Sequence, residues 1–103
     1  MEQIACLYWT VDSLEAAQIL IDGLIEQKLI ACANLLPGVS LYPWAGRVEK
    51  GNEHFVFCKT TQNKVAAAVT YLEEHHSYDI PCITSWQISS STTYARWVQS
   101  VTQ

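Results

Sequence analysis

The segment EEHHSYDIPC, residues 73–82, places two adjacent imidazoles ahead of a thiol. His75 and His76 precede Cys82, and imidazole nitrogen and thiolate sulfur are ligands that copper and zinc accept. If a helix ends near His76 and Pro81 starts the next strand, these groups reach the same end of a sheet. The segment therefore predicts metal ligands for copper or zinc from Cys82 and either His75 or His76, and we take His75 as the candidate. A third ligand would come from a neighbour or water. The alternative is that the histidines only complement the exposed carbonyls of a helix C-terminus.

Other candidate residues have both a functional and a structural explanation. Lys59 ends the run HFVFC and can simply extend its ammonium group to solvent. Tyr42 and Trp44 lie on one face of a predicted hairpin, while the spacing of Tyr94 and Trp97 places them on one side of a predicted helix. Such aromatic residues pack in cores, bind ligands or form subunit interfaces.

Catalytic signatures are absent from the sequence. It contains no GxGxxG, P-loop, HExxH or GxSxG pattern, and its first arginine, Arg47, comes too late for the N-terminal phosphate cradle of an acyl phosphatase. We therefore expect a protein without enzymatic activity.

Composition limits the class of protein. A chain of 103 residues fits one domain, 1–103, and half of its residues are apolar, with four tryptophans. This apolar content favours contact with another subunit. The net charge of −4, with no basic cluster, argues against nucleic acid as a partner, and no apolar run is long enough for a membrane span. Glu2 stands where a secretory signal would be basic, so we expect a soluble, unprocessed chain.

The four cysteines do not form a zinc knuckle or a redox pair. Cys6, Cys32, Cys58 and Cys82 are spaced by 26, 26 and 24 residues, with no CxxC. A sizeable core removes the need for disulfides, so we predict reduced thiols in a cytoplasmic protein.

The elements that must position these residues follow from periodicity. Residues 3–10 predict a strand, 13–29 a helix capped by Asp12, and 29–36 a central strand buried on both faces, broken or bent at Pro37. The sequence then predicts a hairpin whose strands begin at Val39 and return from residue 53, with the turn at 49–52. A helix capped by Asn63 should end near His76, followed by a strand over 82–88 and a C-terminal helix with hydroxyl caps.

This order, βαββαβ plus one helix, is the ferredoxin-like α+β plan, an antiparallel sheet with helices on one face and, here, an extended hairpin. The fold alone does not select a function, because it hosts enzymes, metal carriers and regulatory modules.

Three stretches carry a resemblance to a known family. KLIACANLLPGVSLYPWAGRVEKGNEHFVFCKTT at 28–61, HHSYDIPCIT at 75–84 and YARW at 94–97 resemble the CutA family of divalent-cation tolerance proteins. The resemblance implies a homotrimer whose hairpins reach across to neighbours, a role in metal-ion response with copper binding in some members, and no established reaction. It also implies that Trp44, Lys59, Tyr78 and Trp97 match recurrent positions around intersubunit clefts. We predict these four residues, together with Tyr94, as the ligand-binding residues of the clefts.

Two departures from the family pattern affect the metal prediction. Ser77 replaces the proline of H-P-Y, and Cys82 stands where glutamate usually follows the proline, so an oxygen ligand becomes a sulfur ligand. We expect softer metal preference or loss of binding. The main hypothesis is a cytoplasmic homotrimer that binds a divalent cation or a small anionic ligand; the alternative is a PII-like regulatory or scaffold trimer that binds a small ligand or a protein partner.

Overall fold

The computed structural model describes residues 1–103 as one four-stranded antiparallel sheet and three α-helices. The elements in chain order are β1 (Glu2–Val11), α1 (Leu14–Glu26), β2 (Cys32–Trp44), β3 (Arg47–Thr60), a 3₁₀ turn (Gln62–Lys64), α2 (Val65–His75), β4 (Ile83–Ser90) and α3 (Thr92–Val101). The strand order is β2-β3-β1-β4, with β1 and β3 in the centre. The predicted ferredoxin-like α+β fold with a C-terminal helix is confirmed.

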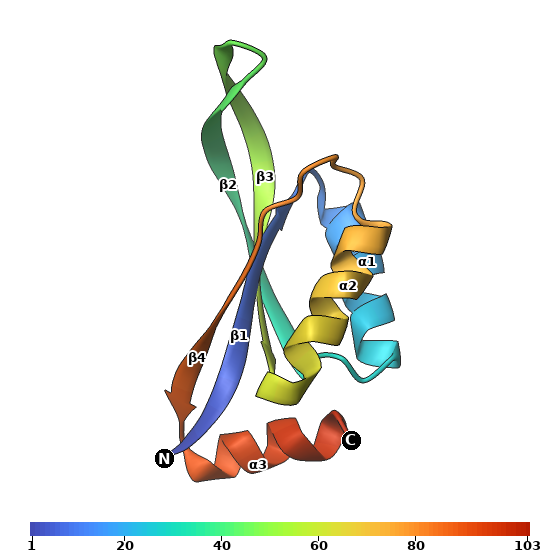
Figure 1. Cartoon of the computed structure of the whole chain (residues 1–103), viewed down its shortest axis with the longest axis vertical. Helices are drawn as coiled ribbons and strands as arrows, with labels where there is room; N and C mark the ends of the chain where they lie inside the picture. Colours follow the sequence, from blue (N-terminus) through green and yellow to red (C-terminus); the bar gives the residue numbers. More distant parts are fainter.

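Helices α1 and α2 lie side by side on one face of the sheet, and α3 lies across its lower end (Figure 1). The main core forms between this face and the two helices, and it includes Leu7, Trp9 and Val56 from the strands and Leu24 and Leu72 from the helices. Gly23 of α1 allows the helices to approach, because a Cβ there would lie 1.8 Å from the Tyr71 hydroxyl. A smaller core of Ile4, Ala95 and Val98 joins α3 to the sheet.

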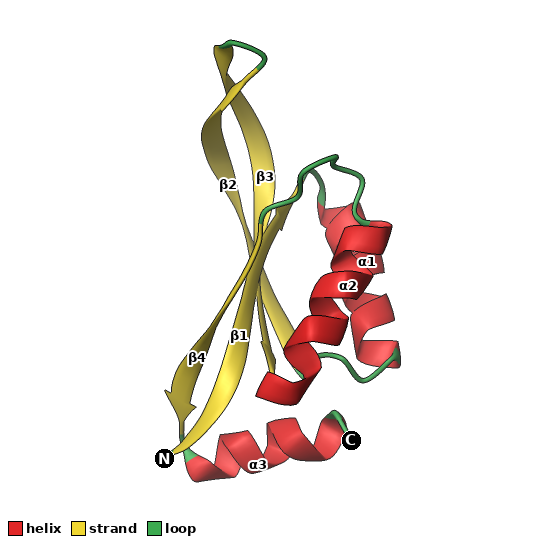
Figure 2. Ribbon diagram, viewed as in Figure 1, coloured by secondary structure: helices red, strands yellow, loops and turns green.

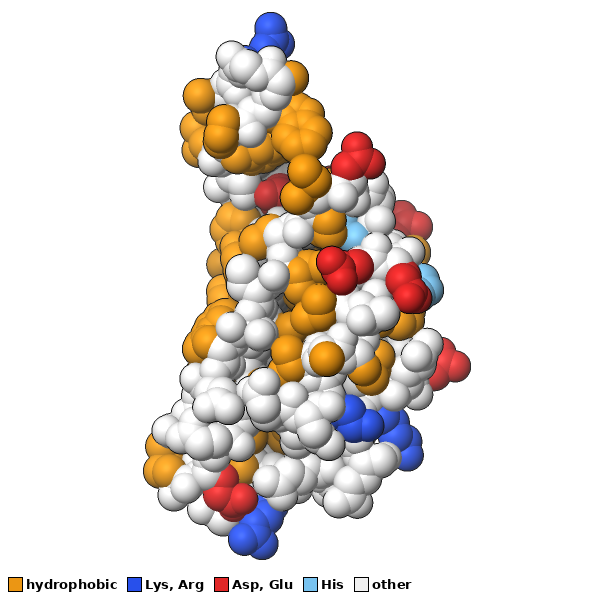
Figure 3. Space-filling model, viewed as in Figure 1, with side chains coloured by type: hydrophobic (Ala, Val, Ile, Leu, Met, Phe, Trp, Pro, Cys, Tyr) orange, Lys and Arg blue, Asp and Glu red, His pale blue; other side chains and the backbone are white.

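The β2–β3 hairpin extends well beyond the helices (Figure 2). Pairing of β3 with β1 begins at His54, so residues 38–53, which we call the ribbon, have no third strand. The ribbon exposes the apolar side chains of Val39, Leu41, Trp44 and Val48. Figure 3 shows hydrophobic side chains gathered over this part of the surface.

Three predictions about the hairpin were wrong. β2 is an edge strand that begins at Cys32, so the segment 29–36 is not central, and the strand continues through Pro37 without a break. The turn is at Ala45-Gly46, and residues 49–52 lie within β3. Positive φ values of 50° and 80° at Ala45 and Gly46 match a two-residue type I′ turn. The sequence did not predict this tight turn, because the segment EKGN at 49–52 contains more residues with a turn preference than Ala45-Gly46 does.

Two of the three predicted N-caps differ from the structure. Ser13, not Asp12, caps α1 by accepting a hydrogen bond from the backbone N–H of Ala16. Asn63 lies in the 3₁₀ turn, where its side chain accepts a hydrogen bond from Thr61. The hydroxyl cap of α3 is confirmed as Ser91, which accepts from Tyr94 N–H.

No helix combines the length and the hydrophobicity that crossing a bilayer requires.

Candidate functional site

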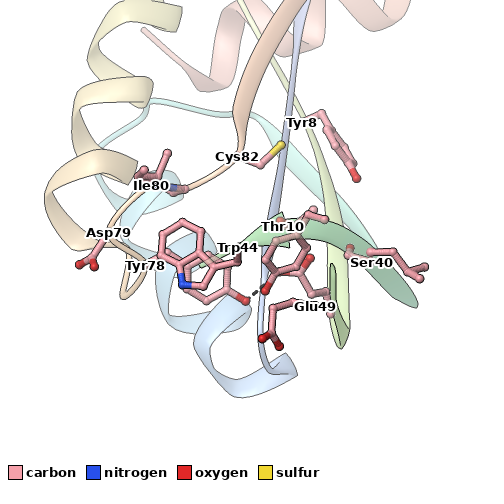
Figure 4. A pocket seen from close by; sticks show the side chains of 13 residues that line it. Tyr8, Thr10, Ser40, Trp44, Glu49, Tyr78, Asp79, Ile80 and Cys82 are labelled. Atoms are coloured by element: carbon pink, nitrogen blue, oxygen red, sulfur yellow. Dashed lines mark hydrogen bonds between the residues drawn. The ribbon is translucent and has the colours of Figure 1, made fainter. Parts of the chain in front are cut away.

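A large cavity, of about 650 Å³, lies where the ribbon meets the segment that leads into β4 (Figure 4). β1, the ribbon and the loop after α2 all contribute to its walls. The lining residues are Tyr8, Thr10, Ser40, Leu41, Tyr42, Trp44, Glu49, Glu53, Tyr78, Asp79, Ile80, Pro81 and Cys82. The lining contains three carboxylates, four large aromatic side chains and one thiol, but no lysine, arginine or histidine.

Glu53 is the buried acid of this cavity. Its residue is only 8% exposed, and its Oε2 accepts a hydrogen bond from the Tyr78 hydroxyl at 2.7 Å. Burial and then the Glu53 carboxylate raise the pKa of Tyr78, so the phenol remains a donor at neutral pH. The bond joins the ribbon to the loop after α2 and fixes one wall of the cavity.

Cys82 contributes the only thiol of the cavity and is solvent-exposed. Partial burial and the negative charge of Glu53 raise the pKa of Cys82. Partial burial, with Cys82 and Glu53 nearby, also raises the pKa of Tyr8. The local potential is thus unfavourable to further negative charge, and a bound cation would promote release of the thiol proton.

His76 is a structural residue. Its Nδ1 accepts from the Tyr78 backbone N–H at 3.1 Å, which leaves Nε2 to donate to the Thr10 carbonyl at 2.7 Å. These partners assign the neutral tautomer with the proton on Nε2. The ring is 9% exposed and lies edge-on to Trp9. Both nitrogens are engaged, so His76 joins the end of α2 to β1 and has no lone pair for a metal.

His75, in contrast, is exposed and has one available nitrogen. Its Nδ1 donates to the Tyr71 carbonyl at 2.8 Å, and its ring stacks on Tyr71 with a centroid distance of 4.1 Å. It lines a separate groove of about 210 Å³ between α1 and the end of α2. The structure therefore brings His75 and Cys82 to one end of the sheet but into different hollows.

The residues of one chain do not make a closed metal site. No group of three or more histidine, cysteine, aspartate or glutamate side chains is arranged to hold a metal ion. Since two protein ligands give weak binding, His75 and Cys82 do not form a metal centre within a single subunit.

The five predicted cleft residues separate into two groups. Trp44 and Tyr78 line the large cavity. Lys59, near the end of β3, and the α3 residues Tyr94 and Trp97 do not line it. Lys59 Nζ donates to Asn34 Oδ1 at 2.6 Å, while the Tyr94 and Trp97 rings pack with centroids 5.6 Å apart.

Tyr94 also forms a hydrogen bond with Cys32. Its hydroxyl is 2.9 Å from the Cys32 sulfur, and burial followed by this hydrogen bond raises the pKa of Tyr94 to about 12. The contact joins α3 to the start of β2, so Tyr94 has a structural role in the subunit.

Glu49, Glu53 and Tyr8 line the cavity but were not predicted from the sequence. A turn at 49–52 would have placed both glutamates beside a loop, whereas the observed register puts them on one face of β3. The missing signal was the two-residue Ala45-Gly46 turn, because strand alternation counted from it brings Glu49 and Glu53 to the same side.

Comparison with known proteins agrees with this architecture. The family model described as CutA1 divalent ion tolerance protein matches residues 5–101. The chain is 38% identical over 77 residues to the divalent-cation tolerance protein CutA of Archaeoglobus fulgidus, covering 75% of this chain and 76% of the relative. It is 31% identical over 99 residues to the chloroplastic protein CutA of Arabidopsis thaliana, covering 94% of this chain but 54% of that protein.

Solved structures give the same result. The CutA1 structure from Ehrlichia chaffeensis has a TM-score of 0.94 at 31% identity, covering 100% of this chain and 98% of that chain. The periplasmic divalent cation tolerance protein CutA from Archaeoglobus fulgidus has a TM-score of 0.94 at 30% identity, covering 99% of this chain and 100% of that chain. With the sequence motifs, the strand order and these matches in agreement, the chain belongs to the CutA1 divalent ion tolerance protein family.

Proposed function

We propose that this protein acts in the response to and tolerance of divalent metal ions as a non-enzymatic, cytoplasmic homotrimer. Membership of the divalent ion tolerance family supports the general role. The observation that carries the proposal of cation binding is the composition of the large cavity, whose lining has three carboxylates and a thiol but no cationic side chain.

The ribbon supports the proposed self-association. Two strands without a third, carrying exposed apolar side chains, are marginally stable in water, and a neighbouring copy would bury them. We propose that each ribbon packs on a neighbour and that the cavity is completed at this junction.

Metal binding in this proposal depends on the assembled protein. One chain lacks three convergent ligands, and its Cys82 and His75 line different hollows. The proposed site therefore takes Cys82 from one subunit and His75 from another, with further donors from the assembly or from water. Nitrogen and sulfur donors favour Cu⁺ or Zn²⁺ over Mg²⁺.

The test is calorimetric titration of Zn²⁺ and Mg²⁺ into the assembled protein under reducing conditions, with Cys82→Ser and His75→Ala as variants. We expect zinc binding by the wild type, weaker binding by both variants and none of magnesium. Equal zinc affinity in all three proteins would remove the two residues from the site, and no zinc binding by the wild type would overturn the proposed metal binding.

A further inference from the structure

We propose that the groove between α1 and the end of α2 is a docking surface for a basic amphipathic helix of a partner protein. This groove is a different hollow from the large cavity, and the proposal goes beyond the proposed function. The partner helix inserts an apolar side chain into the groove and places lysine or arginine side chains around it.

The two helices stay on the outside of the proposed trimer. Trp86 pairs with Cys6, next to Leu7 of the main core, so strand alternation puts Trp86 on the sheet face that α1 and α2 do not cover. A neighbouring copy would bury this face, where Trp86 is 45% exposed, together with the ribbon. α1 and α2 lie on the opposite face (Figure 1). The shape and charge of their groove therefore do not depend on a neighbouring subunit.

The groove has the size and the rigidity of a site for one side chain. Its volume of about 210 Å³ is below the range of small-molecule sites, which begins at about 300 Å³. Ile19, which is 64% exposed, lines it from α1. Tyr71 and His75 line it from α2 with stacked rings, and Gly23 leaves room for the Tyr71 hydroxyl. Because these rings are already held in place, docking requires little further ordering.

The charge of the helices selects a basic partner. α1 and α2 hold five of the ten acidic residues of the chain and none of its six lysines and arginines. Glu15 and Asp22 lie four residues before and three residues after Ile19, so they are its neighbours on the helix surface. Glu74 lies three residues after Tyr71 on α2. None of these three carboxylates has a salt bridge within the chain. Figure 3 shows acidic side chains over the helices.

Other occupants match only part of this surface. The carboxylates would repel nucleic acid and an anionic membrane, and a second copy docked helix to helix would bring the same negative charge. A basic amphipathic helix matches both features, because apolar side chains at helical spacing reach the groove while its cations approach the carboxylates.

The experiment is a fluorescence-anisotropy titration of the assembled protein into a labelled peptide of about 14 residues. This basic peptide consists of lysine and alanine, with leucine at every third or fourth position. One control peptide has glutamine in place of leucine, and the other has glutamate in place of lysine. We expect the basic peptide to bind at least about tenfold more tightly than either control, and less tightly as salt is added. Equal binding of the basic peptide and either control would overturn the proposal.

Two isoleucine variants locate the binding. Ile19→Ser removes an exposed apolar side chain from the groove and should weaken binding of the basic peptide about tenfold. Ile25→Ser is the matched control, because Ile25 is 46% exposed on the same helix but does not line the groove. Its affinity should stay within about twofold of the wild type. Equal weakening by both variants would contradict the groove.

Two glutamate variants test the charge. Glu74→Gln should weaken binding about threefold, the size expected for one exposed ion pair. Glu73→Gln removes the same charge from the adjacent position, which the helical period places on the side of α2 away from Tyr71, and should have a smaller effect. Equal effects would mean that only the net charge matters and would contradict the site.

Sedimentation and zinc titration of Ile19→Ser separate this proposal from the others. The variant should sediment as the wild type does, and a smaller assembly would show that another copy covers the groove, which overturns the proposal. Ile19→Ser leaves His75 and Cys82 in place, so its zinc affinity should be unchanged. A wild type that binds zinc but not the basic peptide refutes the docking surface alone. A wild type that binds the peptide but not zinc refutes the proposed metal binding alone.

Discussion

The body of the subunit, meaning the four-stranded part of the sheet with its helices, and the ribbon both have pleated strands, but they differ in packing. The strands of the body are covered by helices, whereas the ribbon exposes its apolar side chains. In the body, β1 is paired on both edges and covered by α1 and α2, and Leu7, Trp9 and Val56 are fully buried. In the ribbon, residues 38–53 pair only with each other, and Trp44 is 49% exposed. Two tryptophans of one chain therefore have different expected roles: Trp9 holds the subunit together, and Trp44 is available to a neighbour.

The largest expected effect is on the body. Trp9→Ala should lower the free energy of unfolding by about 3–5 kcal/mol, because it removes a fully buried indole and the donor to the Cys58 sulfur. Denaturant unfolding monitored by circular dichroism measures the loss. A loss no larger than that of an exposed-residue substitution would contradict the assigned core.

Trp44→Ala should act on the assembly instead. If the ribbon packs on a neighbour, removal of this side chain costs the interface on the order of 3 kcal/mol and leaves the fold of each subunit intact. Sedimentation at low micromolar concentration should show a trimer for the wild type and smaller species for the variant. A wild-type monomer would contradict the trimer, and a variant trimer of unchanged stability would place Trp44 outside the interface.

Alkaline pH should affect the body through a buried thiol. Burial raises the pKa of Cys58 to about 12 from its ordinary value of 9.0, so the folded protein retains a proton that the unfolded chain releases. The contribution of the protonated Cys58 thiol to the free energy of unfolding is therefore complete below about pH 9. Between pH 9 and 12 the free energy of unfolding falls by up to about 1.4 kcal/mol per pH unit. Urea unfolding at a series of alkaline pH values measures this slope, and Cys58→Ala should reduce it.

The ribbon turn offers the smallest effect. Gly46→Ala should lower the free energy of unfolding by about 1 kcal/mol, because Gly46 has a φ of 80° that a side chain disfavours. Gly51→Ala is the matched control: Gly51 lies in the same ribbon, has no positive φ and has open space where a Cβ would stand, so the change should be neutral or slightly stabilising. Equal losses at both positions would contradict the turn geometry.

Element order, and with it the ferredoxin-like fold, could be predicted from the sequence alone. Apolar alternation in β1 and the helical spacing of α1 and α2 are local patterns, and they remain readable without knowledge of the neighbours. The end of α2 at His75 and the hydroxyl cap of α3 were predictable for the same reason.

Tertiary contacts were needed to establish which strands are central, where the hairpin turns and what each candidate residue contacts. The apolar segment at 29–36 suggested a buried strand, but β2 lies at the edge, since strand order depends on contacts between distant residues. His75 and His76 are adjacent in sequence, yet one is exposed beside Tyr71 and the other bridges Thr10 and Tyr78. Glu53 and Tyr78 are 25 residues apart, and their hydrogen bond forms only because the hairpin register and the exit of α2 bring them together. Local periodicity sets which face a side chain takes, whereas long-range pairing sets its partner.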